Sequence, residues 1–201
     1  MTTQESYKPS PTVNAELKAA QNKASKPLLW IGIVSMVMFW AGLTSAYVVR
    51  ADNGNWLLFN VPSVFIIGTA VIITSSLTLF FALNSAKKNK YQQVTLGLAL
   101  TFVLGIVFTV LQYQGWLELF NSGIVFGGKQ SNASGSFFIL FVFAHVAHLI
   151  GGLISLTITL FKSFKKAYHA DNVLGLELCS MYWHFLDILW VYLFLFLYYI
   201  R

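Results

Sequence analysis

Two ionisable side chains, His184 and Asp187, lie inside the last long apolar run of this 201-residue chain. A third, Glu177, lies just before the run. Residues 177 and 184 are separated by close to two helical turns, and residue 187 lies about one turn beyond 184. A run of this length is long enough to cross a bilayer, where charged groups are costly and therefore face protein rather than lipid. The spacing predicts a buried polar contact between helices.

The preceding apolar run contains two further histidines, His145 and His148. One interpretation of this set is haem ligation, with either histidine facing His184, as in membrane proteins that hold haem between helices. His145 and His148 are too close on one helix to be the axial pair of a single haem. A second interpretation is a proton path, and a third is a structural hydrogen-bonded network. The residues alone favour the structural role and leave the other two open.

The composition is that of a membrane protein. The chain is 57% hydrophobic and only 10% charged, with a mean hydropathy of +0.67, whereas soluble domains carry about a quarter charged residues. The single cysteine, Cys179, excludes an internal disulfide and a cysteine-cluster metal site. The net charge of +6 comes from basic residues in short clusters between apolar runs, a pattern that sets topology and does not indicate nucleic-acid binding.

Five apolar runs have spanning length, and they cover residues 27–49, 62–84, 95–113, 136–161 and 178–200. None alternates with a period of two, which argues against a β-barrel. We therefore predict an all-α, polytopic membrane protein, with a bundle of five transmembrane helices at 27–201 and a polar cytoplasmic tail at 1–26. The tail is expected to carry a short surface helix at about 11–23. Proline at 27 and at 62 suits the opening turn of a helix.

Basic residues predict the orientation of the bundle. With five spans, ten of the 13 basic residues fall on one side. They are Lys8, Lys18, Lys23, Lys26, Lys87, Lys88, Lys90, Lys162, Lys165 and Lys166. Because positive loops stay in the cytoplasm, the N-terminus is predicted inside and the C-terminus outside.

Small and hydroxyl residues within the runs are expected to have structural roles. The glycines at 42, 97, 105, 151 and 152 suit close packing of helices. Serine and threonine at 35, 45, 69, 74, 75, 76 and 78 are expected to bond the carbonyl groups of their own helices. The glycine-rich stretch 115–132 is expected to be a flexible outer loop.

Two motifs resemble a known family. The sequence Tyr-Trp-His-Phe-x-Asp-x-x-Trp at 182–190, with Glu177 five positions before it, is similar to the last helix of subunit III of haem-copper terminal oxidases. Upstream, Gly135-Ser136 is followed by His145, His148 and Gly152, which resembles the Gly-Ser…His-x-x-His-x-x-x-Gly helix of that family. The resemblance extends from about residue 29 to the C-terminus.

The resemblance implies a non-catalytic subunit of a bacterial plasma-membrane oxidase that reduces O2 to water and pumps protons. Haem and copper would belong to partner subunits, so no catalytic, cofactor-binding or metal-binding residue is expected here. The implied partners are the catalytic subunit I, subunit II, membrane phospholipids and a larger respiratory supercomplex. Nucleic acid is not expected as a partner. The implied roles are stabilising subunit I, binding phospholipid and supporting proton uptake, with cytochrome c favoured over quinol as donor. The candidates for structural, lipid or subunit contacts are Gln112, His145, His148, Glu177, Trp183, His184, Asp187 and Trp190.

The chain also departs from the family pattern. The full-length form has seven spans, and the first two have no counterpart here. Met36 stands where relatives have a buried glutamate, and no carboxylate occurs at 112–116 where the family has Gln-x-x-Glu-Tyr. Two alternatives therefore stay open: a haem-b membrane anchor of a respiratory dehydrogenase and a small transporter. A transporter would show repeats, broken helices and ionisable residues in several spans, whereas this chain concentrates its ionisable ones in the last two.

Overall fold

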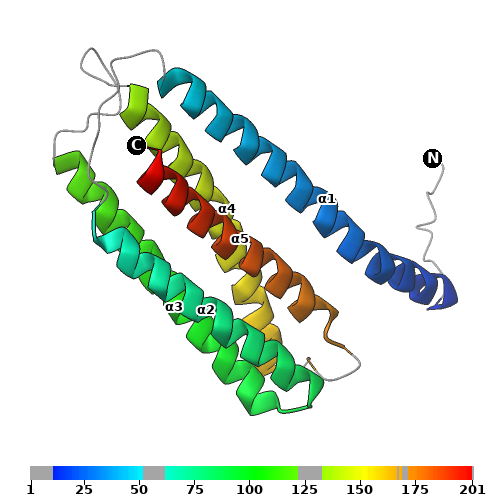
Figure 1. Cartoon of the computed structure of the whole chain (residues 1–201). Helices are drawn as coiled ribbons and strands as arrows, with labels where there is room; N and C mark the ends of the chain where they lie inside the picture. The colour runs from blue at the N-terminus through cyan, green and yellow to red at the C-terminus, as the bar shows by residue number, and fades with distance from the viewer. Residues whose placement is uncertain (1–10, 52–61, 122–132, 167, 169–171, 201) are drawn as a thin grey trace, which may run out of the picture.

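The computed structural model describes residues 11–51, 62–121, 133–166, 168 and 172–200. These residues form five helices: α1 (Pro11–Ala51), α2 (Val64–Lys87), α3 (Tyr91–Asn121), α4 (Ala133–Phe164) and α5 (Leu174–Tyr199). All five are long and apolar enough to cross a membrane, and they lie alongside one another as an elongated bundle (Figure 1). The predicted all-α fold with five spans is thereby confirmed.

Helix α1 differs from the prediction at its N-terminal end. A separate surface helix and a new helix at residue 27 were expected, but α1 is one helix of 41 residues with Pro27 inside it. Proline lacks the N–H that would bond the carbonyl four residues earlier. Pro27 and Lys23, the residue with that carbonyl, are both exposed. The N-terminal part of α1 extends past the ends of the neighbouring helices (Figure 1).

Helix α3 is also longer than predicted. It continues to Asn121, so residues 115–121 are helical and not part of a loop, while 122–132 lie outside the described residues. At its other end a tight turn joins it to α2. Asn89 has a φ of 55°, and the N–H of Lys90 donates to the carbonyl of Ser85 at 3.0 Å. This is the usual left-handed end of a helix, a conformation that asparagine tolerates.

Helices α2 and α3 pack closely because small residues meet at their contact. A Cβ added to Gly97 would lie 2.8 Å from the Cβ of Ala82, so a larger residue would push the helices apart. The hydroxyls of Thr78 and Thr101 hydrogen bond between the two helices at 2.8 Å. The predicted role of glycine in close packing of the helices is confirmed at Gly97.

Helix α5 lies at the centre of the bundle, in contact with α1, α2 and α4. In the described residues α1 touches only α4 and α5, mainly through rings. Trp40 of α1 stacks on Phe141 of α4 with centroids 6.1 Å apart, and Tyr47 meets Phe196 of α5 at 5.2 Å. The central position of α5 places its polar residues against three other helices.

Candidate functional site

Two buried tryptophans of α5 connect it to α2. The indole N–H of Trp183 donates to the hydroxyl of Ser75 at 2.8 Å, and that of Trp190 donates to the hydroxyl of Thr69 at 3.1 Å. Both indoles are almost fully buried, where an unpaired N–H would be costly. The two tryptophans therefore fix how α5 is rotated and placed along α2.

Trp183 fits only because glycines surround it. A Cβ on Gly105 of α3 would lie 2.8 Å from the Trp183 ring, and one on Gly152 of α4 would lie 3.3 Å from it and 2.7 Å from Leu186. The predicted packing role is thus confirmed at these positions. Gly42, by contrast, has nothing within 4 Å of the added Cβ among the described residues, so it takes no part in close packing inside this bundle.

His184 forms a polar contact with α2, as expected for a histidine in a span. Its Nδ1 shares a hydrogen bond with the hydroxyl of Ser76 at 2.5 Å, and its ring is half-buried. Sequence reasoning missed Ser75 and Ser76, which were expected to bond their own helix. The exposed Thr74 does so, donating to the carbonyl of Ala70 at 2.8 Å. The two adjacent serines instead face α5.

Asp187 lies on α5 between the two tryptophans and is buried. Neither of its carboxylate oxygens has a hydrogen-bond partner among the described residues. The Ser76 hydroxyl hydrogen bonds the His184 ring at 2.5 Å. The predicted hydrogen-bond partner of Asp187 stays a prediction.

The two histidines of α4 have different surroundings. His145 is buried, and neither ring nitrogen has a hydrogen-bond partner in the described part of the chain. Its ring lies 5.2 Å from the Trp190 ring and 6.3 Å from the Phe108 ring. His148 is half-buried, and its Nδ1 bonds the carbonyl of Ala144 in its own helix at 2.6 Å. His148 contacts α5 through its backbone carbonyl, which accepts a hydrogen bond from the Tyr182 hydroxyl at 3.1 Å.

Glu177 lies apart from the other polar residues of α5. Its carboxylate pairs with the ammonium of Lys26 on α1 at 2.6 Å. Lys26 is about half exposed, so this ion pair is worth at most about 1 kcal/mol. The helical spacing that groups Glu177 with His184 did not identify this partner, because the lysine comes from a distant helix.

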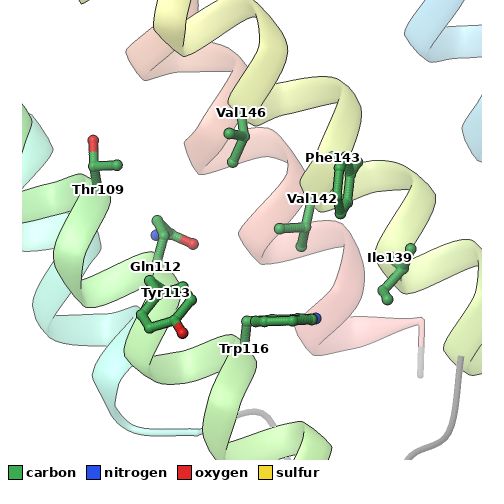
Figure 2. A pocket seen from close by; sticks show the side chains of 8 residues that line it. All are labelled: Thr109, Gln112, Tyr113, Trp116, Ile139, Val142, Phe143 and Val146. Atoms are coloured by element: carbon green, nitrogen blue, oxygen red, sulfur yellow. The ribbon is translucent and has the colours of Figure 1, made fainter.

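Gln112 of α3 is the remaining polar candidate. It is 3% exposed, and neither its amide nitrogen nor its oxygen has a hydrogen-bond partner among the described residues. It lines a cavity of about 300 Å³ between α3 and α4, the other walls of which are mainly apolar (Figure 2). Within the described part of the chain, no three His, Cys, Asp or Glu residues lie close enough together to hold a metal ion.

A second cavity, of about 360 Å³, lies between α1, α4 and α5. Its lining includes Lys162 and Tyr168, together with apolar side chains such as Leu29 and Leu178. Burial raises the pKa of the Tyr168 phenol above its ordinary value, so this group stays protonated at neutral pH and is able to donate a hydrogen bond. The cavity therefore combines a cation and a hydroxyl donor with an apolar wall.

Comparison with known proteins gives one consistent result. The family model described as cytochrome c oxidase subunit III matches residues 22–201. The chain is 31% identical over 173 residues to cytochrome c oxidase subunit 3 of Corynebacterium diphtheriae, covering 82% of each chain. It is 32% identical over 191 residues to cytochrome bo(3) ubiquinol oxidase subunit 3 of Buchnera aphidicola subsp. Baizongia pistaciae, covering 90% of this chain and 95% of the relative. The resemblance seen in the motifs is confirmed, and the chain belongs to the cytochrome c oxidase subunit III family.

Proposed function

We propose that this chain is a cofactor-free accessory subunit of a proton-pumping haem-copper oxidase in the bacterial plasma membrane. There it would stabilise the catalytic subunit I beside subunit II and support proton uptake. The observation that carries the proposal is the family match across residues 22–201, nearly the whole chain. The family motif residues Trp183, Asp187 and Trp190 are buried in the centre of the bundle, as expected of residues that maintain the fold.

The surroundings of the histidines favour a subunit without haem over the alternative of a haem-b anchor. His148 is bonded to its own helix at 2.6 Å, and His184 to Ser76 at 2.5 Å. The His145 ring packs against Trp190 and Phe108. Both hydrogen bonds use Nδ1 and leave Nε2 open to a metal, but neither of the two cavities described above is lined by a histidine. A pyridine-haemochrome assay of the purified chain tests this, and one haem per chain would refute the cofactor-free proposal.

Phospholipid binding is proposed for the cavity between α1, α4 and α5. An anionic headgroup phosphate is complementary to the ammonium of Lys162, and the Tyr168 phenol is a suitable second donor. Leu29 and Leu178 supply apolar surface for the start of an acyl chain. Lys162 also lies at the end of α4, where basic residues are predicted to face the cytoplasm.

The lipid proposal is tested by the phosphorus content of the purified complex. Lys162→Ala is expected to lose about one tightly bound phospholipid per complex. Lys165→Ala is the matched control, because Lys165 is an exposed lysine that does not line the cavity. Equal phosphorus in both variants and in the unchanged complex would refute this lipid site.

The assembly is tested by affinity purification of the chain from native membranes. We expect subunits I and II to co-purify with the chain, and the eluate to show the absorption spectrum of haem. Any further respiratory complexes in the eluate would identify the members of the proposed supercomplex. Relatives carry both cytochrome c and ubiquinol oxidase names, and cytochrome c is the donor proposed here. Oxidation of reduced cytochrome c by the eluate supports this donor, and oxidation of quinol alone refutes it.

Support of proton uptake is a separate proposal with its own test. A complex stripped of this chain is expected to start at a normal rate and to lose activity progressively during turnover. Constant activity of the stripped complex over the same number of turnovers would contradict this role.

A further inference from the structure

Two lysines from separate segments line a third cavity, of about 450 Å³, at one end of the bundle. Lys90 lies in the turn between α2 and α3, and Lys166 follows the end of α4. The rest of the lining consists of Tyr91, Gln92 and Gln93 of α3. The start of α3 and the end of α4 lie at the same end of the bundle (Figure 1). The predicted topology places this end in the cytoplasm.

A buried contact between α3 and α4 holds the two lysines beside one cavity. The hydroxyls of Thr95 and Ser163 share a hydrogen bond of 2.7 Å, and Ser163 is buried. The N–H of Lys166 in turn donates to the carbonyl of Ser163 at 2.9 Å. Lys166 has a φ of 52°, a left-handed conformation that ends the helix. The placement of Lys166 therefore depends on the packing of α4 against the first turns of α3.

The cavity is strongly basic. None of its lining residues is acidic, and two ammonium groups in one cavity repel each other unless an anion lies between them. The same two segments carry four further lysines, namely Lys87, Lys88, Lys162 and Lys165. Asp171, the acidic residue that precedes α5, lies outside the described residues. A positive potential around a cavity raises the local concentration of anions.

The remaining lining groups supply hydrogen-bond donors. The Tyr91 hydroxyl and the Gln92 amide can each donate one or more bonds. The amide oxygen of Gln93 accepts a hydrogen bond from the Ser85 hydroxyl at 3.4 Å, which leaves the N–H groups of this amide available to an acceptor in the cavity. Phosphate oxygens accept several hydrogen bonds at once, and lysine commonly binds them as a point charge. The chemistry of the lining therefore matches a phosphate group.

We propose that this cavity binds a small soluble anion with two or more phosphate groups, an inorganic or nucleoside polyphosphate from the cytoplasm. Two lysines complement more than one negative charge, and the volume is that of a small-molecule site. The lining contains no aliphatic side chain, whereas the cavity beside Lys162 has Leu29 and Leu178. An acyl chain has nothing to lie against here, which favours a soluble phosphate over a lipid headgroup.

The test measures binding of radiolabelled pyrophosphate to the intact oxidase complex in neutral detergent, by equilibrium dialysis at low ionic strength. Lys90→Gln and Lys166→Gln should each weaken binding about fivefold, the size of effect expected from one exposed charge. Lys165→Gln is the matched control. It also removes one lysine charge next to Lys166, but Lys165 is exposed and does not line the cavity, so binding should be unchanged.

The proposal fails if Lys165→Gln weakens binding as much as Lys90→Gln and Lys166→Gln, because the effect would then be one of general surface charge. It also fails if the unchanged complex binds no pyrophosphate at millimolar concentration. Competition distinguishes the two sources of phosphate. Tripolyphosphate should displace the bound pyrophosphate, and displacement by a soluble short-chain phosphatidylglycerol at a lower concentration than by tripolyphosphate would assign the cavity to a lipid headgroup instead.

Discussion

The indole N–H of Trp183 on α5 donates to the hydroxyl of Ser75 on α2 at 2.8 Å, inside a bundle where both side chains are buried. Close to two turns later along α5, Trp190 makes the equivalent bond to Thr69. A single hydrogen bond allows α5 to rotate, but two along the same helix pair do not. The motif tryptophans therefore act first on the geometry of the bundle, which in turn places His184 and Asp187.

Ser75→Ala should destabilise the subunit, because it leaves the buried Trp183 N–H without a partner. The expected loss is about 1–3 kcal/mol in the free energy of unfolding. The control is Thr74→Ala, since the exposed Thr74 bonds only its own helix. Thermal unfolding of the purified chain in detergent gives the comparison. A Ser75→Ala variant as stable as Thr74→Ala would show that this bond contributes nothing.

Gly105→Ala should separate α3 from α5, because its Cβ would lie 2.8 Å from the ring of Trp183. Overpacking of this kind costs about 1–3 kcal/mol. Gly42→Ala is the matched control, since its Cβ meets nothing within 4 Å. Retention of each variant in the complex during purification measures the effect. We expect Gly105→Ala to be partly lost, and retention equal to that of Gly42→Ala would contradict the packing role.

Asp187→Ala and His184→Ala should loosen the subunit from the complex while leaving haem content and spectrum unchanged. The His184→Ala variant loses the hydrogen bond to Ser76. Asp187 is a buried carboxylate, and the Asp187→Ala variant leaves its predicted hydrogen-bond partner unpaired. Oxidase activity should decline gradually and not disappear. The measurement is activity and haem spectrum in complexes that still retain the subunit. Complete loss of activity, or of a haem signal, would assign these residues to chemistry instead of structure.

The topology prediction rests on the ten basic residues placed on one side. Reporter fusions after Lys90 and Lys166 should report cytoplasm, and fusions after Lys129 and Arg201 should report the outside. Charge asymmetry between loops is the physical basis. An inside location for the C-terminus would rule out the five-span orientation.

The sequence by itself determined the number and approximate positions of the helices, because bilayer thickness sets the length of each apolar run. It also identified buried positions on α5 and close-packing glycines at 97, 105 and 152. Polar groups in a membrane span face protein and not lipid, and small residues allow helices to approach closely. Helix ends were less well predicted. Pro27 lies inside a helix and residues 115–121 are helical, whereas the sequence predicted a helix start at 27 and a loop from 115.

Only the tertiary structure decided which polar groups meet. Ser75 and Ser76 look like residues that bond their own helix, and their partners Trp183 and His184 lie 108 positions away. Glu177 pairs with Lys26 of α1, and Gln112 lies beside a cavity with no hydrogen-bond partner among the residues that the structure describes. Periodicity along one helix defines which side chains share a face, but the packing of separate helices determines what that face touches.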